Sequence, residues 1–181
     1  MPERDARVKA RQNAYAVLRE INAPARLIRH AELVGEAADQ LIARLDDLTV
    51  KFDKTLVLAG VVLHDAGKTL FPEEFDAPGE KHESAGRELL TRRGVPIDLA
   101  RCCVSHAQWK TMDCSLEELL IALADKLWKG KREPELEAVV VDRVALRLNV
   151  DRWEVFIDLD SCFEQIAAGG PERLERSKQF R

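Results

Sequence analysis

A helical repeat of apolar residues over residues 25–46 constrains the fold of this chain more than any other feature. The repeat places apolar side chains three or four positions apart, at Leu27, Ile28, Ala31, Leu33, Val34, Ala37, Ala38, Leu41, Ile42 and Leu45. Because an α-helix has about 3.6 residues per turn, this spacing gathers them on one face. Residues 4–21 carry a similar stripe among many charges, which is typical of an amphipathic helix. Together the two segments favour an all-α fold.

Helix-start signals divide the rest of the chain into further predicted helices. Asp53 is a suitable N-cap for a helix that reaches about Ala66. Ser115, with Glu118 three residues later, forms a capping box for another helix. Four more helices are predicted over residues 81–94, 96–106, 135–148 and 151–167.

The most apolar stretch of the chain runs from Leu56 to Leu63. Propensity alone leaves two interpretations open, because a buried strand and a buried helix both read as an unbroken apolar run. Residues 69–80 contain two prolines and a glycine among acidic residues, and they are predicted to form a loop.

The bulk composition fits one globular domain over residues 1–181. Hydrophobic residues make up 46% of the chain and charged residues 33%, which is enough to build an apolar core. The formal net charge of −4 and the pI of about 5.7 give no global basic field for a nucleic-acid backbone. No stretch approaches the roughly 20 apolar residues of a membrane span, and the charged N-terminus does not resemble a signal peptide.

The cysteines indicate a reducing compartment. Cys102, Cys103, Cys114 and Cys162 show no CxxC spacing, and adjacent cysteines do not readily pair with each other. We therefore expect reduced thiols, small buried side chains and a cytoplasmic location.

The strongest functional signal is the order in which the four histidines occur with two aspartates. The pattern H…HD…H…H…D is formed by His30, His64, Asp65, His82, His106 and Asp125. Imidazole and carboxylate groups together bind borderline and hard divalent metals. A lone His-Asp pair is a weak signal, whereas the run Leu63-His64-Asp65-Ala66-Gly67-Lys68 is far more specific.

On these residues the chain resembles the HD-domain superfamily of metal-dependent phosphohydrolases, over roughly residues 25–130. The resemblance implies a single-domain bundle of about seven to nine helices. In such a bundle residues 56–63 belong to a central helix that ends in the metal-binding pair, and Gly67 suits the helix terminus. C-terminal helices over residues 135–167 and a charged tail over residues 169–181 complete the expected domain.

The resemblance also implies which residues bind metal. His30, His64, Asp65 and Asp125 would form a first site, and Asp65 would bridge to a second metal bound by His82 and His106. We expect two divalent ions, drawn from iron, manganese, cobalt, zinc and magnesium. If His82 and His106 instead orient the substrate or are structural, the site binds one metal. Neighbours on a helix point about 100° apart, so His64 and Asp65 converge only near a helix end or distortion.

Three other residues are candidates for contact with the substrate. Lys68 would neutralise a phosphate oxygen and act with Asp65 in catalysis, or would be a favourable cation at a helix C-terminus. Trp109 and Lys110 would stack on a base and bind a phosphate, although an aromatic residue near a helix end more often packs in the core. The basic residues that follow Trp128 form either a rim of the site or a solvated turn.

These features predict a hydrolase that cleaves a small-molecule phosphoester, a nucleotide or a dinucleotide, with metal-activated water. The alternatives are a one-metal nucleotidase, an HD-type di-iron oxygenase and a nucleotide-binding sensor without turnover. The sequence leaves the substrate, the metal and a homodimer open.

Overall fold

The computed structural model describes residues 2–178, and the fold is helical with no strand among these residues. In chain order the elements are α1 (Pro2–Glu20), α2 (Ala25–Asp47), α3 (Lys54–Leu63), η1 (Ala66–Thr69), η2 (Pro72–Phe75), α4 (Lys81–Arg92), α5 (Ile97–Gln108), α6 (Leu116–Leu127), α7 (Pro134–Leu148), α8 (Arg152–Ala168) and α9 (Gly170–Ser177), where η1 and η2 are 3-10 helices. The prediction of an all-α bundle is confirmed.

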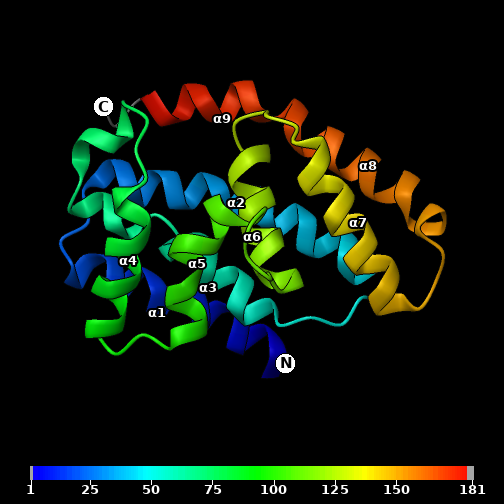
Figure 1. Cartoon of the computed structure of the whole chain (residues 1–181), viewed down its shortest axis with the longest axis horizontal. Coiled ribbons are helices and arrows are strands. Elements are labelled where there is room, and N and C mark those ends of the chain that lie inside the picture. The colour runs from blue at the N-terminus through cyan, green and yellow to red at the C-terminus, as the bar shows by residue number, and fades with distance from the viewer. Residues whose placement is uncertain (1, 179–181) are drawn as a thin grey trace.

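Helix α3 lies inside the bundle and packs against α1, α2, α5 and α6 (Figure 1). Every residue from Val57 to Leu63 is buried, so this helix has no polar face. A helix that is surrounded by other helices carries apolar residues on every side. Its sequence is therefore an unbroken apolar run, like that of a buried strand. The predicted N-cap is confirmed, because the Asp53 carboxylate accepts hydrogen bonds from the backbone N–H groups of Thr55 and Leu56.

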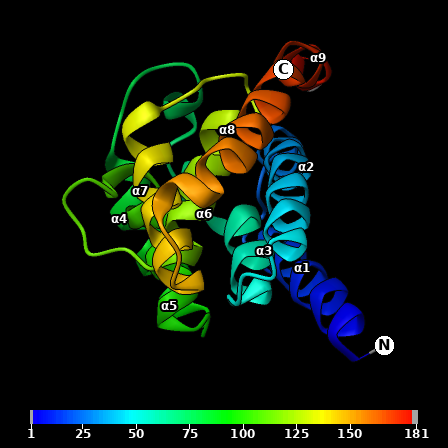
Figure 2. The same ribbon diagram turned by 90° about the vertical axis from the view of Figure 1, so that its right-hand side faces the viewer.

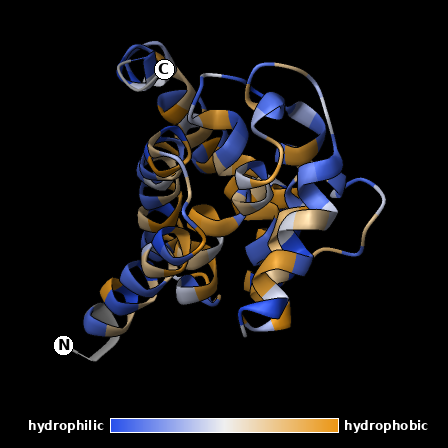
Figure 3. Ribbon diagram, turned by 90° about the vertical axis from the view of Figure 1, so that its left-hand side faces the viewer, coloured by the Kyte–Doolittle hydropathy of each residue, from blue (hydrophilic) through white to orange (hydrophobic). Residues whose placement is uncertain are grey.

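Two apolar cores meet at α3. One core joins α3 to α1, the start of α2 and the α4–α5 region, and the other joins it to α2, α6, α7 and α8. Hydrophobic residues concentrate in the interior of the bundle, and hydrophilic residues cover much of α1 and the C-terminal region (Figure 3). Within the described residues, no helix has both the length and the apolar content that crossing a bilayer requires.

The cysteines are part of these cores, as their expected role as small buried side chains predicts. All four are buried free thiols. Burial raises the pKa of the Cys102 thiol to about 12, so it stays protonated and unreactive at neutral pH.

The C-terminal helices cover α2 and α6 (Figure 2). The predicted charged tail contains helix α9, and Arg173 within it is buried. Its guanidinium donates hydrogen bonds to the backbone carbonyl oxygens of Leu127, Trp128 and Ile166, which offsets the cost of burying the charge. The last residues of the predicted tail, 179–181, lie outside the described part of the chain.

Candidate metal centre

The His64–Asp65 pair lies where helix α3 ends. The helix stops at Leu63, earlier than the predicted end at Ala66, and His64 is its C-cap. Asp65 has φ −103° and ψ 14°, outside the α-helical range, and precedes η1. This break in the helix removes the divergence of neighbouring side chains, and both point towards His30.

Four side chains from α2, the end of α3 and α6 converge, and we name them the first group: His30, His64, Asp65 and Asp125. The Nε2 atom of His30 lies 3.3 Å from His64 Nε2, 3.2 Å from Asp65 Oδ2 and 3.6 Å from Asp125 Oδ1. Asp125 Oδ1 also lies 3.6 Å from His64 Nε2. The group therefore gathers two imidazole nitrogens and two carboxylate oxygens around one point.

A second group lies on the other side of the Asp65 carboxylate and consists of Asp65, His82 and His106. His82 Nε2 lies 3.2 Å and His106 Nε2 3.6 Å from Asp65 Oδ1. The first group uses the other oxygen of the same carboxylate, Oδ2. Asp65 thus faces both groups, one with each oxygen, as a bridging ligand would.

Hydrogen bonds fix which nitrogen of each ring faces the cluster. The Nδ1 atom of His64 lies 3.0 Å from the carbonyl oxygen of Val61, and that of His106 lies 3.1 Å from the carbonyl oxygen of Cys102. A carbonyl oxygen only accepts, so each Nδ1 carries the proton and donates. The Nε2 lone pairs are then free to face the cluster.

Glu74, a residue that the sequence analysis did not single out, plays the same part for His82. Its carboxylate lies 2.6 Å from His82 Nδ1 and accepts hydrogen bonds from the backbone N–H groups of His82 and Lys81. The N-cap residue of α4, Glu80, provides no side-chain cap, so Glu74 takes over that function from the preceding loop. The segment 69–80, predicted as a loop, contains the 3-10 helix η2, which carries Glu74, and this segment positions a ring of the second group.

Gly67 allows the two groups to meet. A Cβ atom at this position would lie 1.9 Å from the carbonyl oxygen of His82 and 2.7 Å from the backbone nitrogen of Gly86. Any other residue would push η1 away from α4, and Asp65 would move with it. The φ angle of Gly67 is not positive, so close approach accounts for this glycine and the expected helix-terminus conformation does not.

The pKa values of the cluster favour metal-binding protonation states. Burial lowers the pKa of His106 to about 3 and lowers that of His30. Burial alone would raise the pKa values of Asp65 and Asp125, but neighbouring imidazole and ammonium groups hold both well below the ordinary value. His82 is the exception, because its two carboxylate partners raise its pKa despite burial. Neutral imidazoles and ionised carboxylates are the forms that bind metals.

The donor atoms fit divalent metal ions. Asp65 Oδ1 and His82 Nε2 are buried without a hydrogen-bond partner among the described residues. Leaving such atoms unpaired costs roughly 1–3 kcal/mol each, and a bound cation would satisfy both. Ligand atoms lie within 4.8 Å of one another in each of two sets, one of His30, His64 and Asp65 and one of Asp65, His82 and His106.

Both groups open into one cavity of about 620 Å³. Lys68 lies in its wall, with Nζ 2.7 Å from Asp65 Oδ2. Trp109 and Lys110 do not line it: Trp109 packs against the apolar core, and Lys110 pairs with Glu135 on the surface. Helix α5 ends at Gln108, just before both residues. Their contact with a substrate stays a prediction.

Four further basic residues line the cavity: Arg26 and Arg29 from α2, Lys126 from the last turn of α6, and Lys129 just after that helix. Only Lys129 belongs to the residues after Trp128 that the sequence left ambiguous. The sequence did offer a signal for Arg26 and Arg29, because they are three positions apart on a helix and directly precede the candidate ligand His30. Arg132 does not belong to this rim, because it forms ion pairs with Glu137 and Asp160.

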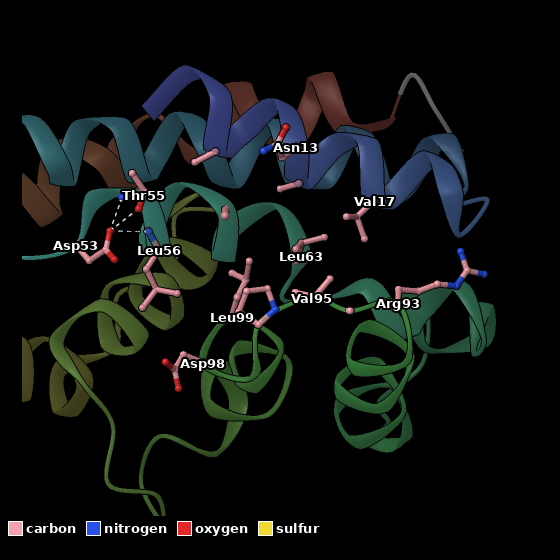
Figure 4. Close-up of a pocket in the computed structure, with 15 residues that line it drawn as sticks. Asn13, Val17, Asp53, Thr55, Leu56, Leu63, Arg93, Val95, Asp98 and Leu99 are labelled. Atoms are coloured by element: carbon pink, nitrogen blue, oxygen red, sulfur yellow. Dashed lines mark hydrogen bonds between the residues drawn. The ribbon is translucent and has the colours of Figure 1, made fainter. Parts of the chain in front are cut away.

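A second cavity of about 500 Å³ lies between α1, α3 and the start of α5 (Figure 4). Its wall is largely apolar, with Val17, Leu63 and Leu99 among the residues, and it contains no histidine or cysteine. Asp53 also borders it, but its carboxylate caps α3. None of the six candidate ligands lines this second cavity.

A model of the HD domain matches residues 27–130, which is more than half of the chain. The chain belongs to the HD domain family. Members of this family are generally hydrolases, and the domain typically binds divalent metals. The two candidate ligand groups and most of the cavity wall lie inside the matched residues, whereas α7, α8 and α9 lie beyond them. No solved structure matches the chain at a significant level.

Proposed function

We propose that this protein is a metal-dependent phosphohydrolase that cleaves a phosphoester of a nucleotide or dinucleotide at a two-metal centre. The observation that carries the proposal is the Asp65 carboxylate, whose two oxygens face two separate groups of imidazole nitrogens. A site that binds only one metal would not explain why His82 and His106 both face the second oxygen of Asp65.

The metals would be bound by the first and second groups, and the ligands suit iron, manganese, cobalt, zinc or magnesium. When bound, they would supply an activated water and polarise the phosphate. His64, His82 and His106 are each oriented by a hydrogen bond at Nδ1, so the centre is pre-organised by the protein.

Lys68 is the candidate catalytic cation. Its ammonium lies beside the bridging carboxylate and in the cavity wall, where a reacting phosphate would be placed. It would neutralise a phosphate oxygen as charge develops there. Lys126 has a similar position, with Nζ 3.0 Å from Asp125 Oδ2.

The charge of the cavity supports an anionic substrate. Among the described residues, five lysine and arginine side chains line the cavity against three carboxylates, those of Asp65, Glu83 and Asp125. The excess of positive charge, increased by any bound metal, attracts phosphate groups although the whole chain is acidic. This favours an anionic substrate, such as a phosphoester, over an uncharged diol.

The test is hydrolysis by the protein loaded with Mn²⁺ or Co²⁺, followed by chromatography of the products, across nucleoside mono-, di- and triphosphates, cyclic nucleotides and dinucleoside polyphosphates. We expect turnover of at least one class, and none with Asp65→Ala. Nucleotide binding without turnover under every metal would identify a sensor module instead. Oxygen uptake without hydrolysis of any ester would identify an oxygenase.

A further inference from the structure

One wall of the metal-centre cavity comes from a helix outside the residues that define the family. Leu174 and Ser177 of α9 line the cavity, whereas the HD match ends at residue 130. The cavity is thus completed by a segment particular to this chain's C-terminal region. Residues of α9 are therefore candidates for substrate selectivity beyond that of the HD residues.

Helix α9 is anchored to the helix that carries a candidate ligand. Arg173 donates hydrogen bonds to the carbonyl oxygens of Leu127 and Trp128, at the end of α6 just after Asp125. Arg176 forms a bidentate ion pair with Glu36 of α2. Two elements that carry first-group residues therefore fix the position of α9, and with it the position of Leu174 relative to the centre.

Leu174 is an apolar side chain at the edge of a charged cavity. Burying a leucine side chain stabilises a protein, yet Leu174 stays 37% exposed. Phe75 from η2 and Trp128 at the C-terminal end of α6 line the same cavity. The guanidinium of Arg26 lies 4.8 Å from the centre of the Phe75 ring, so the Phe75 ring adjoins the cationic rim. These three side chains are mainly apolar and offer a phosphate group no charge to pair with, so they suit another part of the substrate.

We propose that Leu174 is a specificity-determining residue that contacts an apolar aromatic group in the alcohol part of the phosphoester, as the base is carried by the sugar of a nucleotide. This inference rests on the proposed function, because it takes the cavity to be the phosphoester site. Leu174 covers the aromatic group, the basic residues neutralise the phosphate, and the HD residues perform the chemistry. Selection among phosphoesters then depends on α9.

The experiment compares two ligands that differ in one apolar group, phenylphosphonate and methylphosphonate. Neither is a phosphoester, so equilibrium binding to the Mn²⁺-loaded protein can be measured by calorimetry without turnover. We expect the wild-type protein to prefer phenylphosphonate. Leu174→Ala should reduce that preference about fivefold to tenfold and leave methylphosphonate binding unchanged.

Leu146→Ala is the matched control, since Leu146 is 75% exposed on α7 and does not line the cavity. It should leave both affinities unchanged. Equal weakening of both phosphonates by Leu174→Ala, or no preference for phenylphosphonate in the wild type, would overturn the inference. Absence of turnover on every phosphoester would overturn the proposed function, whereas a phenyl preference that depends on Leu174 would still support this role.

Discussion

The two groups of the metal centre are held by different kinds of structure. The first group lies on α2, α6 and the end of α3, and its residues are brought together by helix packing in the core. The second group depends on a loop, because Glu74 orients His82 and also caps α4. Packing of the helices is therefore enough to position the first group, whereas the second group also requires a contact from residues 69–80.

Asp65 belongs to both groups, so its loss has the largest expected effect. Asp65→Ala should remove both metals and lower turnover by roughly a thousandfold or more, because the ligands of each group lose their shared carboxylate. Elemental analysis and chromatography of the hydrolysis products measure the two effects. Asp98→Ala, which changes an exposed carboxylate on α5, should alter neither. Full metal content in Asp65→Ala would contradict the bridging role.

His106 tests whether the groups are separable. His106→Gln keeps most of the side-chain volume and removes one nitrogen from the second group only. We expect the metal content to fall from about two to about one per chain, because the first group keeps all its members. Elemental analysis after dialysis measures this ratio. Retention of both metals would assign His106 another role.

Glu74 tests the dependence of the second group on the loop. Glu74→Gln should weaken the weaker of two metal-binding events by about 10–100-fold and leave the stronger one unchanged, since the histidine ring loses its charged partner. Titration with Co²⁺ followed by calorimetry resolves the two events. Glu73→Gln, a change at the exposed neighbouring glutamate, is the control and should match the wild type. Equal weakening of both events would show that the loop supports the entire centre.

Lys68 should affect rate and leave metal binding intact. Lys68→Ala removes the ammonium beside Asp65 but none of the candidate ligand atoms. We expect an unchanged metal content and a fall in kcat of about tenfold to a hundredfold, because charge on the phosphate is no longer neutralised. Steady-state kinetics on the best substrate measure it, with Lys81→Ala as an exposed control. Unchanged turnover would favour the helix-end interpretation of Lys68.

The difference between the two groups also explains which parts of the site could be predicted from the sequence. Helical periodicity and caps located the helices that carry the candidate ligands, and the order of histidines and aspartates selected residues that the structure does bring together. Position along a periodic helix is visible in one sequence, because the spacing itself encodes the buried face.

Contacts made by loops and by distant helices could not be read in the same way. Glu74 is one of several acidic residues between Phe71 and Lys81, and nothing local distinguishes it. Leu174 lies in a segment with the composition of a solvated tail. Two long-range contacts, the buried Arg173 and the Arg176–Glu36 ion pair, hold that segment beside the cavity. Trp109 and Lys110 are close to His106 in the chain but are not among the residues that line the cavity, because helix α5 ends at Gln108 before them.

The central claim is that this protein binds two metals through one shared carboxylate. The most direct test is elemental analysis of tag-free protein, purified without chelator and without air and then saturated with Mn²⁺ or Co²⁺. The account predicts about two metals per chain. A value that stays close to one at saturation would contradict it and would leave His82 and His106 outside the set of metal ligands.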